Sequence, residues 1–408
     1  MLRMLVSLVA LLVVSPVAAQ ESSPLPAPLD AAAVVRLARE RRDEIAAARA
    51  RAVAAGERPK IVSALPDPRI AVQAGVPFGL GAYEGNITFE QEFPLSSIRG
   101  NRRRAAEAVV ERWGADTRRA ALDVEYQALD SFYMLAERRG TAPILDEQIA
   151  ITDQLTTVAR AHLGSGQGTQ ADALRLENET ARFRMERRAL DSEVRAAEAM
   201  LDAALARDPA APIPELAWID ELSDPPPLDD IVRQALAIRP ELASARADRR
   251  RALAEVDVMR SMYEPMAVVR AGPSHFMTDG YGVMAMVGIT VPLWREKLGA
   301  GVREAEAMAS MARSDIAAMQ RMIAGSIGAA RERVLAERTR LVAIQQDILP
   351  RARQVVASAS ASFGAGQGSM LAVLDATRDL REIRVDELMA RRRLSVAWAR
   401  LRRERGEL

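Results

Sequence analysis

Few residues in this sequence could support catalysis or metal binding. The chain has two histidines and no cysteine, which excludes a disulfide framework, a thiolate zinc site, an iron–sulfur cluster and a cysteine nucleophile. His162 and His275 alone cannot form a multi-histidine metal site. The usual cofactor-binding and catalytic signatures are also absent from the sequence. We therefore predict no catalytic residue, no cofactor and no resident metal, and we expect that the chain is not an enzyme.

The more distinctive positions are two glycine-rich segments, each followed by an aspartate, Asp172 in the first case and Asp375 in the second. A sharp turn between helices favours glycine, which adopts positive φ without strain. An aspartate in a first helical turn, such as Asp172, also suits the positive end of the helix dipole. Asp375 lies deeper in its helix. The glycines are Gly164, Gly166, Gly168, Gly364, Gly366 and Gly368.

These segments belong to an internal duplication. Residues 163–168 match residues 363–368 at an offset of 200, and residues 68–75 match residues 265–272 at an offset of 197. Further matches keep the same order, so the chain is a tandem duplication of a unit of about 200 residues.

The duplication gives the predicted domain organisation. Arg3, an apolar run and small residues before Gln20 predict a secretory signal peptide. Proline interrupts the chain between the two repeats, which predicts a compact connector that buries Leu216, Trp218, Ile219 and Leu222. The predicted segments are the signal peptide 1–19, the first repeat 20–208, the connector 209–227 and the second repeat 228–408.

Each repeat is predicted to contain a helix, two strands, a long helix, a glycine-rich turn and a second long helix. Residues 169–208 and 369–405 contain no glycine or proline, so each segment could form a helix of about 50 to 60 Å. Helices of this length usually stabilise one another as coiled coils. We therefore expect antiparallel helix pairs with residues 164–168 and 364–368 at their tips.

Strand pairs are predicted at residues 68–94 and 265–292, where apolar and polar residues alternate. Ile70 and Val72 share one face in the first pair, and Val283 and Val287 share one face in the second. Eight of the 16 aromatic residues fall in residues 68–94 and 263–294, as expected for the interfacial girdles of membrane strands. The alternative is a pair of soluble hairpins that cap a coiled coil.

An open sheet edge cannot face lipid, so membrane strands would require oligomerisation. Two copies would supply eight strands and three would supply twelve, and sequence patterning leaves this choice open. Long apolar segments after Gln20 are interrupted by Arg or Glu at helical spacing, so no transmembrane helix is predicted. The net charge of +1 provides no general field for nucleic acid.

The signal peptide, the duplicated architecture and the tip motifs together resemble the TolC-type outer-membrane efflux channels. The tip motifs are Leu163-Gly164-Ser165-Gly166-Gln167-Gly168 with Asp172-Ala173-Leu174, and Gly364-Ala365-Gly366-Gln367-Gly368 with Val373-Leu374-Asp375-Ala376. The resemblance implies a mixed fold: long antiparallel coiled coils form a periplasmic tunnel, and four strands per chain enter a shared 12-stranded transmembrane β-barrel. It also implies a homotrimer in the outer-membrane lipid of a Gram-negative type envelope. A periplasmic adaptor and an inner-membrane pump would dock at the tips.

Other motifs are similar to the heavy-metal branch of this family. They are Ala64-Leu65-Pro66-Asp67-Pro68, Glu90-Gln91-Glu92-Phe93-Pro94 and Arg99-Gly100-Asn101-Arg102-Arg103. The branch commonly has Gly-Lys-Arg where this chain has Gly100-Asn101-Arg102. The implied function is a passive export duct for heavy-metal cations. Drugs or other small solutes, type I secretion, and a purely structural coiled-coil protein are the alternatives.

The resemblance also assigns roles to the tip residues. Asp172 and Asp375 match acidic positions at the channel constriction, where three copies would form carboxylate rings that favour cations. For Asp172, the helix dipole offers an equally simple explanation. The six glycines would allow the helices of the adaptor to approach closely. The family's basic residue at the second tip is replaced by Gly368.

Overall fold

The computed structural model describes residues 25–75, 84–165, 169–276, 280–365 and 367–407. The predicted signal peptide, Gly166, Gly168, Gly366 and residues 76–83 of the first hairpin lie outside these residues. The described part is mostly helical, with one small antiparallel sheet and one short parallel strand pair.

The two repeats have corresponding elements in the same order. The first comprises β1 (Leu29–Asp30), α1 (Ala31–Arg41), α2 (Asp43–Ser63), β2 (Arg69–Gly75), β3 (Glu84–Pro94), α3 (Ile98–Gly164) and α4 (Gln170–Ala204). The segment between the repeats contains β4 (Leu216–Ala217). The second comprises α5 (Leu228–Ile238), α6 (Pro240–Ser261), β5 (Met266–Phe276), β6 (Gly280–Thr290), α7 (Arg295–Ala343), the π-helical turn η1 (Ile344–Ile348), α8 (Leu349–Gly364) and α9 (Met370–Arg405).

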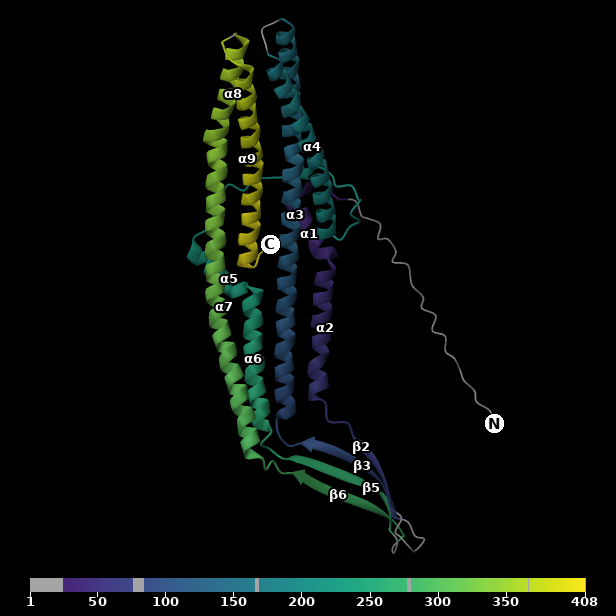
Figure 1. Cartoon of the computed structure of the whole chain (residues 1–408). Coiled ribbons are helices and arrows are strands. Elements are labelled where there is room, and N and C mark those ends of the chain that lie inside the picture. Colours follow the sequence, from purple (N-terminus) through teal and green to yellow (C-terminus); the bar gives the residue numbers. More distant parts are fainter. Residues whose placement is uncertain (1–24, 76–83, 166–168, 277–279, 366, 408) are drawn as a thin grey trace, which may run out of the picture.

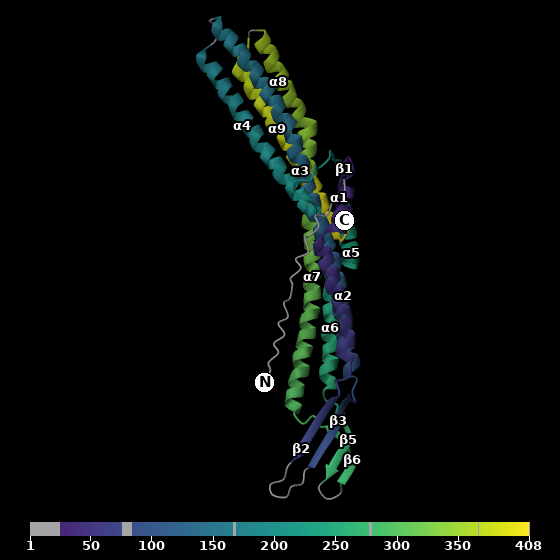
Figure 2. The same cartoon turned by 90° about the vertical axis from the view of Figure 1, so that its right-hand side faces the viewer.

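The molecule is a long rod with the four-stranded sheet at one end and the interhelical turns at the other (Figures 1 and 2). The 67 residues of α3 extend for about 100 Å at the rise of an α-helix. α7, η1 and α8 follow a similar course in the second repeat (Figure 1). Towards the sheet, α3 packs against α2 and α6, and towards the turns it packs against α4 and α9.

The shorter helices meet end to end near the middle of the rod. In the first repeat, Arg42 lies between α1 and α2, and its Nη1 donates to the carbonyl oxygen of Ala203 in α4 at 3.3 Å. In the second repeat, Arg239 lies between α5 and α6, and its Nη1 donates to the Glu404 carboxylate in α9 at 2.7 Å. An arginine at each helix break therefore binds the end of the returning helix, and this joint was not predicted from the sequence.

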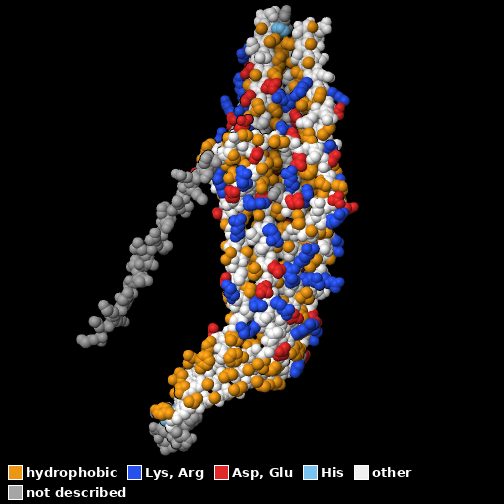
Figure 3. All heavy atoms as spheres, turned by 180° about the vertical axis from the view of Figure 1, so that it is seen from behind, with side chains coloured by type: hydrophobic (Ala, Val, Ile, Leu, Met, Phe, Trp, Pro, Cys, Tyr) orange, Lys and Arg blue, Asp and Glu red, His pale blue; other side chains and the backbone are white. Residues whose placement is uncertain are grey.

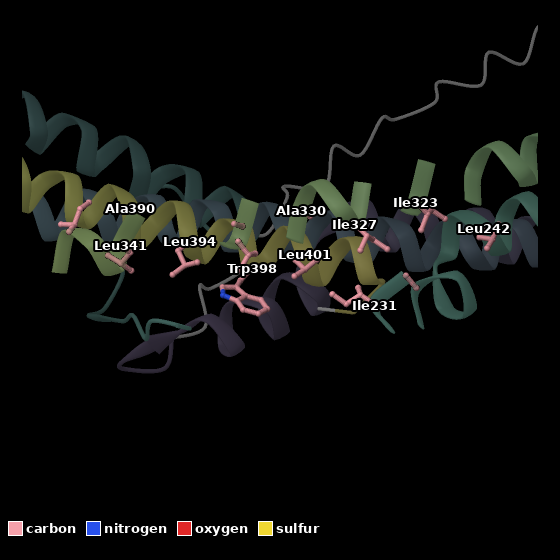
Figure 4. Close-up of a cluster of buried hydrophobic side chains, with 14 residues drawn as sticks. Ile231, Leu242, Ile323, Ile327, Ala330, Leu341, Ala390, Leu394, Trp398 and Leu401 are labelled. Carbon is pink, nitrogen blue, oxygen red and sulfur yellow. The ribbon is translucent and has the colours of Figure 1, made fainter. Parts of the chain in front are cut away.

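Apolar side chains fill the middle of the rod around these joints. In the second repeat, Ile231 of α5, Ile327 of α7 and Leu401 of α9 belong to one buried cluster (Figure 4). In the first repeat, Leu29, Val34, Phe132 and Leu201 belong to a corresponding cluster. Fully burying such a side chain contributes about 1.5 to 3 kcal/mol, so these clusters attach the short helices α1 and α5 to the rod.

The connector is only partly buried. Trp218 packs as expected: its Nε1 donates to Ser395 Oγ at 3.1 Å, and the Arg391 guanidinium lies 4.5 Å from its ring centroid. Leu216 lies in β4, which pairs in parallel with β1. The expected burial of Ile219 and Leu222 is wrong, because these side chains are 83% and 40% exposed. Polar contacts from Trp218 and neighbouring residues, rather than a continuous apolar face, hold this segment.

The two hairpins join into one antiparallel sheet in the order β2-β3-β5-β6. The strand register places Ile70, Phe89, Ala271 and Ala285 in one row across the sheet. The next row contains Arg69, Glu90, Arg270 and Met286. Successive rows point to opposite faces, so the sheet has one apolar face and one face with ion-paired residues.

The seam between the repeats depends on a glycine. A Cβ atom on Gly272 of β5 would lie 1.9 Å from the Ile87 carbonyl oxygen of β3. No side chain could occupy that space without moving the backbone. Gly272 therefore allows β3 and β5 to approach closely where the two repeats pair.

Candidate functional site

The turns of both repeats form one structure at the end of the rod. Leu155 of α3, Leu176 of α4 and Leu374 of α9 belong to a buried cluster, and Phe363 of α8 packs against it. The two helical hairpins are therefore held together as a unit at the end that is distant from the sheet (Figure 1).

The first residues after each turn form helix caps. Thr169 Oγ1 accepts a hydrogen bond from the Asp172 amide at 3.2 Å and donates to Asp172 Oδ2 at 2.7 Å. At the second turn, Ser369 Oγ accepts from the Ala372 amide at 3.1 Å. Such caps satisfy backbone N–H groups that have no partner within the helix. The structure thus gives Asp172 a role in starting α4.

The expectation that the tip glycines adopt positive φ is wrong for the three that the structure describes. Among the described glycines, positive φ occurs at Gly280 and Gly406, not at Gly164, Gly364 or Gly368. The physical requirement at Gly368 is space, because a Cβ atom there would lie 2.9 Å from the Phe363 backbone nitrogen. Tight chain reversal, rather than a left-handed backbone, explains this glycine.

Asp375 lies in an open pocket of about 660 Å³ between α4 and α9. Its side chain is 69% exposed and lies 3.3 Å from the Arg378 guanidinium. Arg378 also pairs with Glu179 at 2.5 Å. Burial disfavours the charged form of Glu179, but Arg378 and Arg182 outweigh this effect and lower the pKa of its carboxyl.

The structure does not bring Asp172 and Asp375 together within one chain. Asp172 is absent from the described residues that line the Asp375 pocket, whereas Arg175, Arg182 and Arg378 contribute to it. At the offset of 200, the counterpart of Asp375 is Arg175. Sequence reasoning missed these arginines, although aligning the helices of the two repeats would have identified Arg175.

The sheet is a second functional surface. Viewed from behind, hydrophobic side chains cover the sheet end, whereas Lys, Arg, Asp and Glu side chains are spread over the helices (Figure 3). The exposed fraction is 74% for Val72, 50% for Phe89 and 77% for Val287. On the opposite face, the Glu90 carboxylate binds Arg270 and lies 3.4 Å from Arg69. An exposed apolar patch of this kind marks a protein or membrane contact.

Within the described ranges, no helix has the length and apolar character that a membrane crossing requires. The same ranges contain no group of three or more His, Cys, Asp or Glu side chains that could hold a metal ion.

Comparisons with known proteins agree with this arrangement. The family model "Outer membrane efflux protein" matches residues 231–407, within the second repeat. The cobalt-zinc-cadmium resistance protein CzcC of Cupriavidus metallidurans is 24% identical over 296 residues, which are 71% of this chain and 69% of CzcC.

Solved structures share the fold over nearly the whole chain. CusC superimposes with a TM-score of 0.80 at 15% identity and covers 93% of this chain and 92% of its own. The outer-membrane channel OprN superimposes with a TM-score of 0.79 at 16% identity and covers 93% of this chain and 90% of its own.

The rod, its apolar sheet and these matches define an outer-membrane channel that extends into the periplasm. The second repeat matches the outer membrane efflux protein family over residues 231–407, and the chain as a whole has the fold of solved efflux channels of the TolC type. The predicted family, the efflux function, the outer-membrane location and the expectation of a non-enzymatic protein are therefore confirmed.

Proposed function

We propose that three copies of this chain form the outer-membrane duct of a tripartite efflux system for heavy-metal cations. The observation that carries the proposal is the sheet, which has an exposed apolar face and two edge strands, β2 and β6. β2 and β6 each pair with one strand among the described residues. Open edges are not tolerated in lipid, so neighbouring copies would pair β6 with β2, and three copies would close a twelve-stranded barrel.

The opposite end of the rod supports the assignment of adaptor and pump as partners. With the sheet in the outer membrane, the turns near Gly164 and Gly364 project farthest into the periplasm (Figure 2). At each of these two glycines, no atom beyond the adjacent residues and the backbone of the same helix lies within 4 Å of the position that a Cβ atom would occupy. The surface at Gly164 and Gly364 is therefore bare, which supports close docking of helices from an adaptor protein. We include Gly166, Gly168, Gly366 and Gly368 in the proposed docking surface.

The assignment of metal cations as cargo rests on the likeness to CzcC, which is a cobalt-zinc-cadmium resistance protein. Since the duct is passive, the pump selects the cargo, and no metal-ligand cluster is needed in the chain. Cells that contain the cognate adaptor and pump but lack this chain are expected to retain cobalt, zinc and cadmium. Supplying the chain should restore efflux, measured as cell-associated metal after loading.

The matched control in that experiment is the same strain with the chain but with an inactive pump. Restored metal efflux that disappears in this control would support the proposal. If metal retention stays unchanged while efflux of drugs or dyes is restored, the channel serves a different pump class and the metal assignment is wrong.

We also propose that Asp375 forms a carboxylate ring at the channel constriction. Its 69% exposure leaves it free to face symmetry copies. Arg175 and Arg378 line the same pocket and weaken the negative field. Asp172 would share the ring only if its carboxylate can serve both the helix cap and the tunnel.

Single-channel recordings separate these roles. The Asp375→Ala variant is expected to show lower cation preference and weaker block by di- and trivalent cations, because a carboxylate ring attracts cations. Asp172→Ala should instead lower stability by roughly 0.3 to 1 kcal/mol if it only serves the helix end. Asp229→Ala, which removes an exposed carboxylate from α5, is the control. Unchanged preference and block in the Asp172→Ala, Asp375→Ala double variant would exclude the acidic ring.

A further inference from the structure

A second open pocket, of about 470 Å³, lies between α3, α7 and α9 near the middle of the rod. Four arginines line it, and no carboxylate belongs to its described lining. Hydroxyl groups of Tyr126 and Ser326 complete its polar surface. The arginines are Arg333, Arg392, Arg393 and Arg400.

Two of these arginines have carboxylate partners outside the pocket. Arg392 lies 3.3 Å from Asp130 and 3.4 Å from Glu137, and Arg333 lies 3.2 Å from Glu337. Arg393 and Arg400 are exposed and have no ion pair or hydrogen bond within the described ranges. Arg393 and Arg400 thus bring two positive charges to the pocket that are not held in an ion pair with a described carboxylate.

The internal repeat shows that the architecture does not require these two charges. At the offset of 200, Ala197 and Leu201 of α4 correspond to Ala397 and Leu401 of α9, and all four are buried. The same alignment pairs Arg393 with Glu193 and Arg400 with Met200. Exposure to solvent would explain a polar residue at positions 393 and 400. It does not explain why both residues are arginine in α9 when neither is arginine in α4.

The pocket opens on the face of the rod opposite to the connector. Arg391 pairs with Asp220 of the connector at 2.9 Å, and Arg331 Nε donates to the Pro226 carbonyl oxygen at 3.1 Å. Arg393 and Arg333 each follow one of these residues by two positions, a rotation of about 200° around an α-helix. They must therefore point away from the connector.

We infer that this pocket is an anion-binding site for a small oxyanion or carboxylate solute. Guanidinium groups present paired N–H donors that match carboxylate and phosphate oxygens. Burial and the nearby Asp130 carboxylate raise the pKa of Tyr126, which keeps its hydroxyl group available as a donor. The binding step requires only this chain. In the proposed trimer, the face opposite to the connector would line the tunnel, and three such pockets would form a ring of positive charge. This placement rests on the proposed function.

Inorganic phosphate is the probe for this site. Titration calorimetry on the detergent-solubilised full chain, at constant ionic strength, is expected to detect phosphate binding. An Arg393→Glu, Arg400→Met variant introduces the residues of the first repeat and should weaken binding about tenfold or more. The control is Arg249→Gln, Arg321→Gln, which also changes two exposed arginines but lies outside the pocket lining.

Weaker binding in the pocket variant with unchanged binding in the control would support the site. Absence of phosphate binding by the wild-type chain, or equal loss in both variants, would overturn it. Light scattering on the same samples reports the oligomeric state. Phosphate binding by a chain that is not trimeric would retain the site and contradict the proposed assembly instead.

Discussion

Replacing Glu404 by alanine is expected to destabilise the folded chain by about 1.5 to 3 kcal/mol, because the buried Arg239 guanidinium loses one charge-assisted hydrogen bond and keeps only Glu241 as a carboxylate partner. Arg239 Nη1 lies 2.7 Å from Glu404, and the two side chains are 4% and 9% exposed. Ser326 Oγ donates to the same carboxylate at 2.7 Å. This cluster joins the break between α5 and α6 to the end of α9. Its loss should therefore weaken the packing of α9 against that break.

Chemical denaturation followed by helical circular dichroism measures this effect on the detergent-solubilised chain. The control is Glu57→Ala, which removes an exposed carboxylate 2.9 Å from Lys60 and should cost at most about 1 kcal/mol. If the two substitutions have similar effects, the cluster is not a principal source of stability.

Acid titration gives the same prediction a second readout. Burial raises the pKa of Glu404, but Ser326 and Arg239 outweigh it, so the net pKa is lowered. The pKa of Glu241 is lowered in the same way, because Arg239 outweighs burial. A lowered folded-state pKa contributes stability above the unfolded pKa, about 4.3 for Glu. That contribution is lost as pH falls through the folded pKa, and Glu404→Ala should reduce this acid-dependent loss.

Introducing arginine on the apolar face of the sheet should prevent insertion into the outer membrane. Val72 is 74% exposed and lies opposite Ile87 of β3. Arginine at the midplane of a bilayer costs about 2 to 4 kcal/mol on a lipid-facing strand, and a trimer would contain the change three times. We therefore expect Val72→Arg to reduce the amount of assembled channel in the outer-membrane fraction sharply.

Gln73→Arg is the matched control, because the neighbouring residue points to the other face of the same strand and pairs with Asn86. It should assemble at close to the wild-type level. Equal assembly of Val72→Arg and Gln73→Arg would show that this face does not contact lipid, and would contradict the proposed arrangement of the sheet.

Regular patterns in the sequence predicted much of this fold. Alternation within residues 68–94 predicted two strands whose apolar residues share one face. The structure confirms this, because Ile70 and Phe89 lie opposite each other in the sheet. The absence of glycine and proline after Thr169 predicted the long helix α4. These features follow from local periodicity, which does not depend on distant residues.

Features that depend on distant contacts were not predicted. The pair Arg239 and Glu404 is 165 positions apart, and neither residue belongs to a local motif. The parallel pairing of Leu29 with Leu216 could not be predicted either, because two-residue strands have no periodic pattern. At the candidate site, the spacing of Thr169 and Asp172 indicated a helix start. Arg378 lies in the same helix as Asp375, but Arg175 and Arg182 reach the pocket from α4, a contact that local spacing does not indicate.

The seam between β3 and β5 also orders the events of folding. Each hairpin pairs strands that are close in sequence, whereas the seam pairs residues of different repeats, such as Pro94 with Met266. Pairing over such separations is slow, because the intervening chain must lose entropy before the contact forms. Until the second repeat is available, β3 therefore has an open edge beside an exposed apolar face. Incorrect strand pairing is most accessible during that interval, and synthesis of the second repeat ends it.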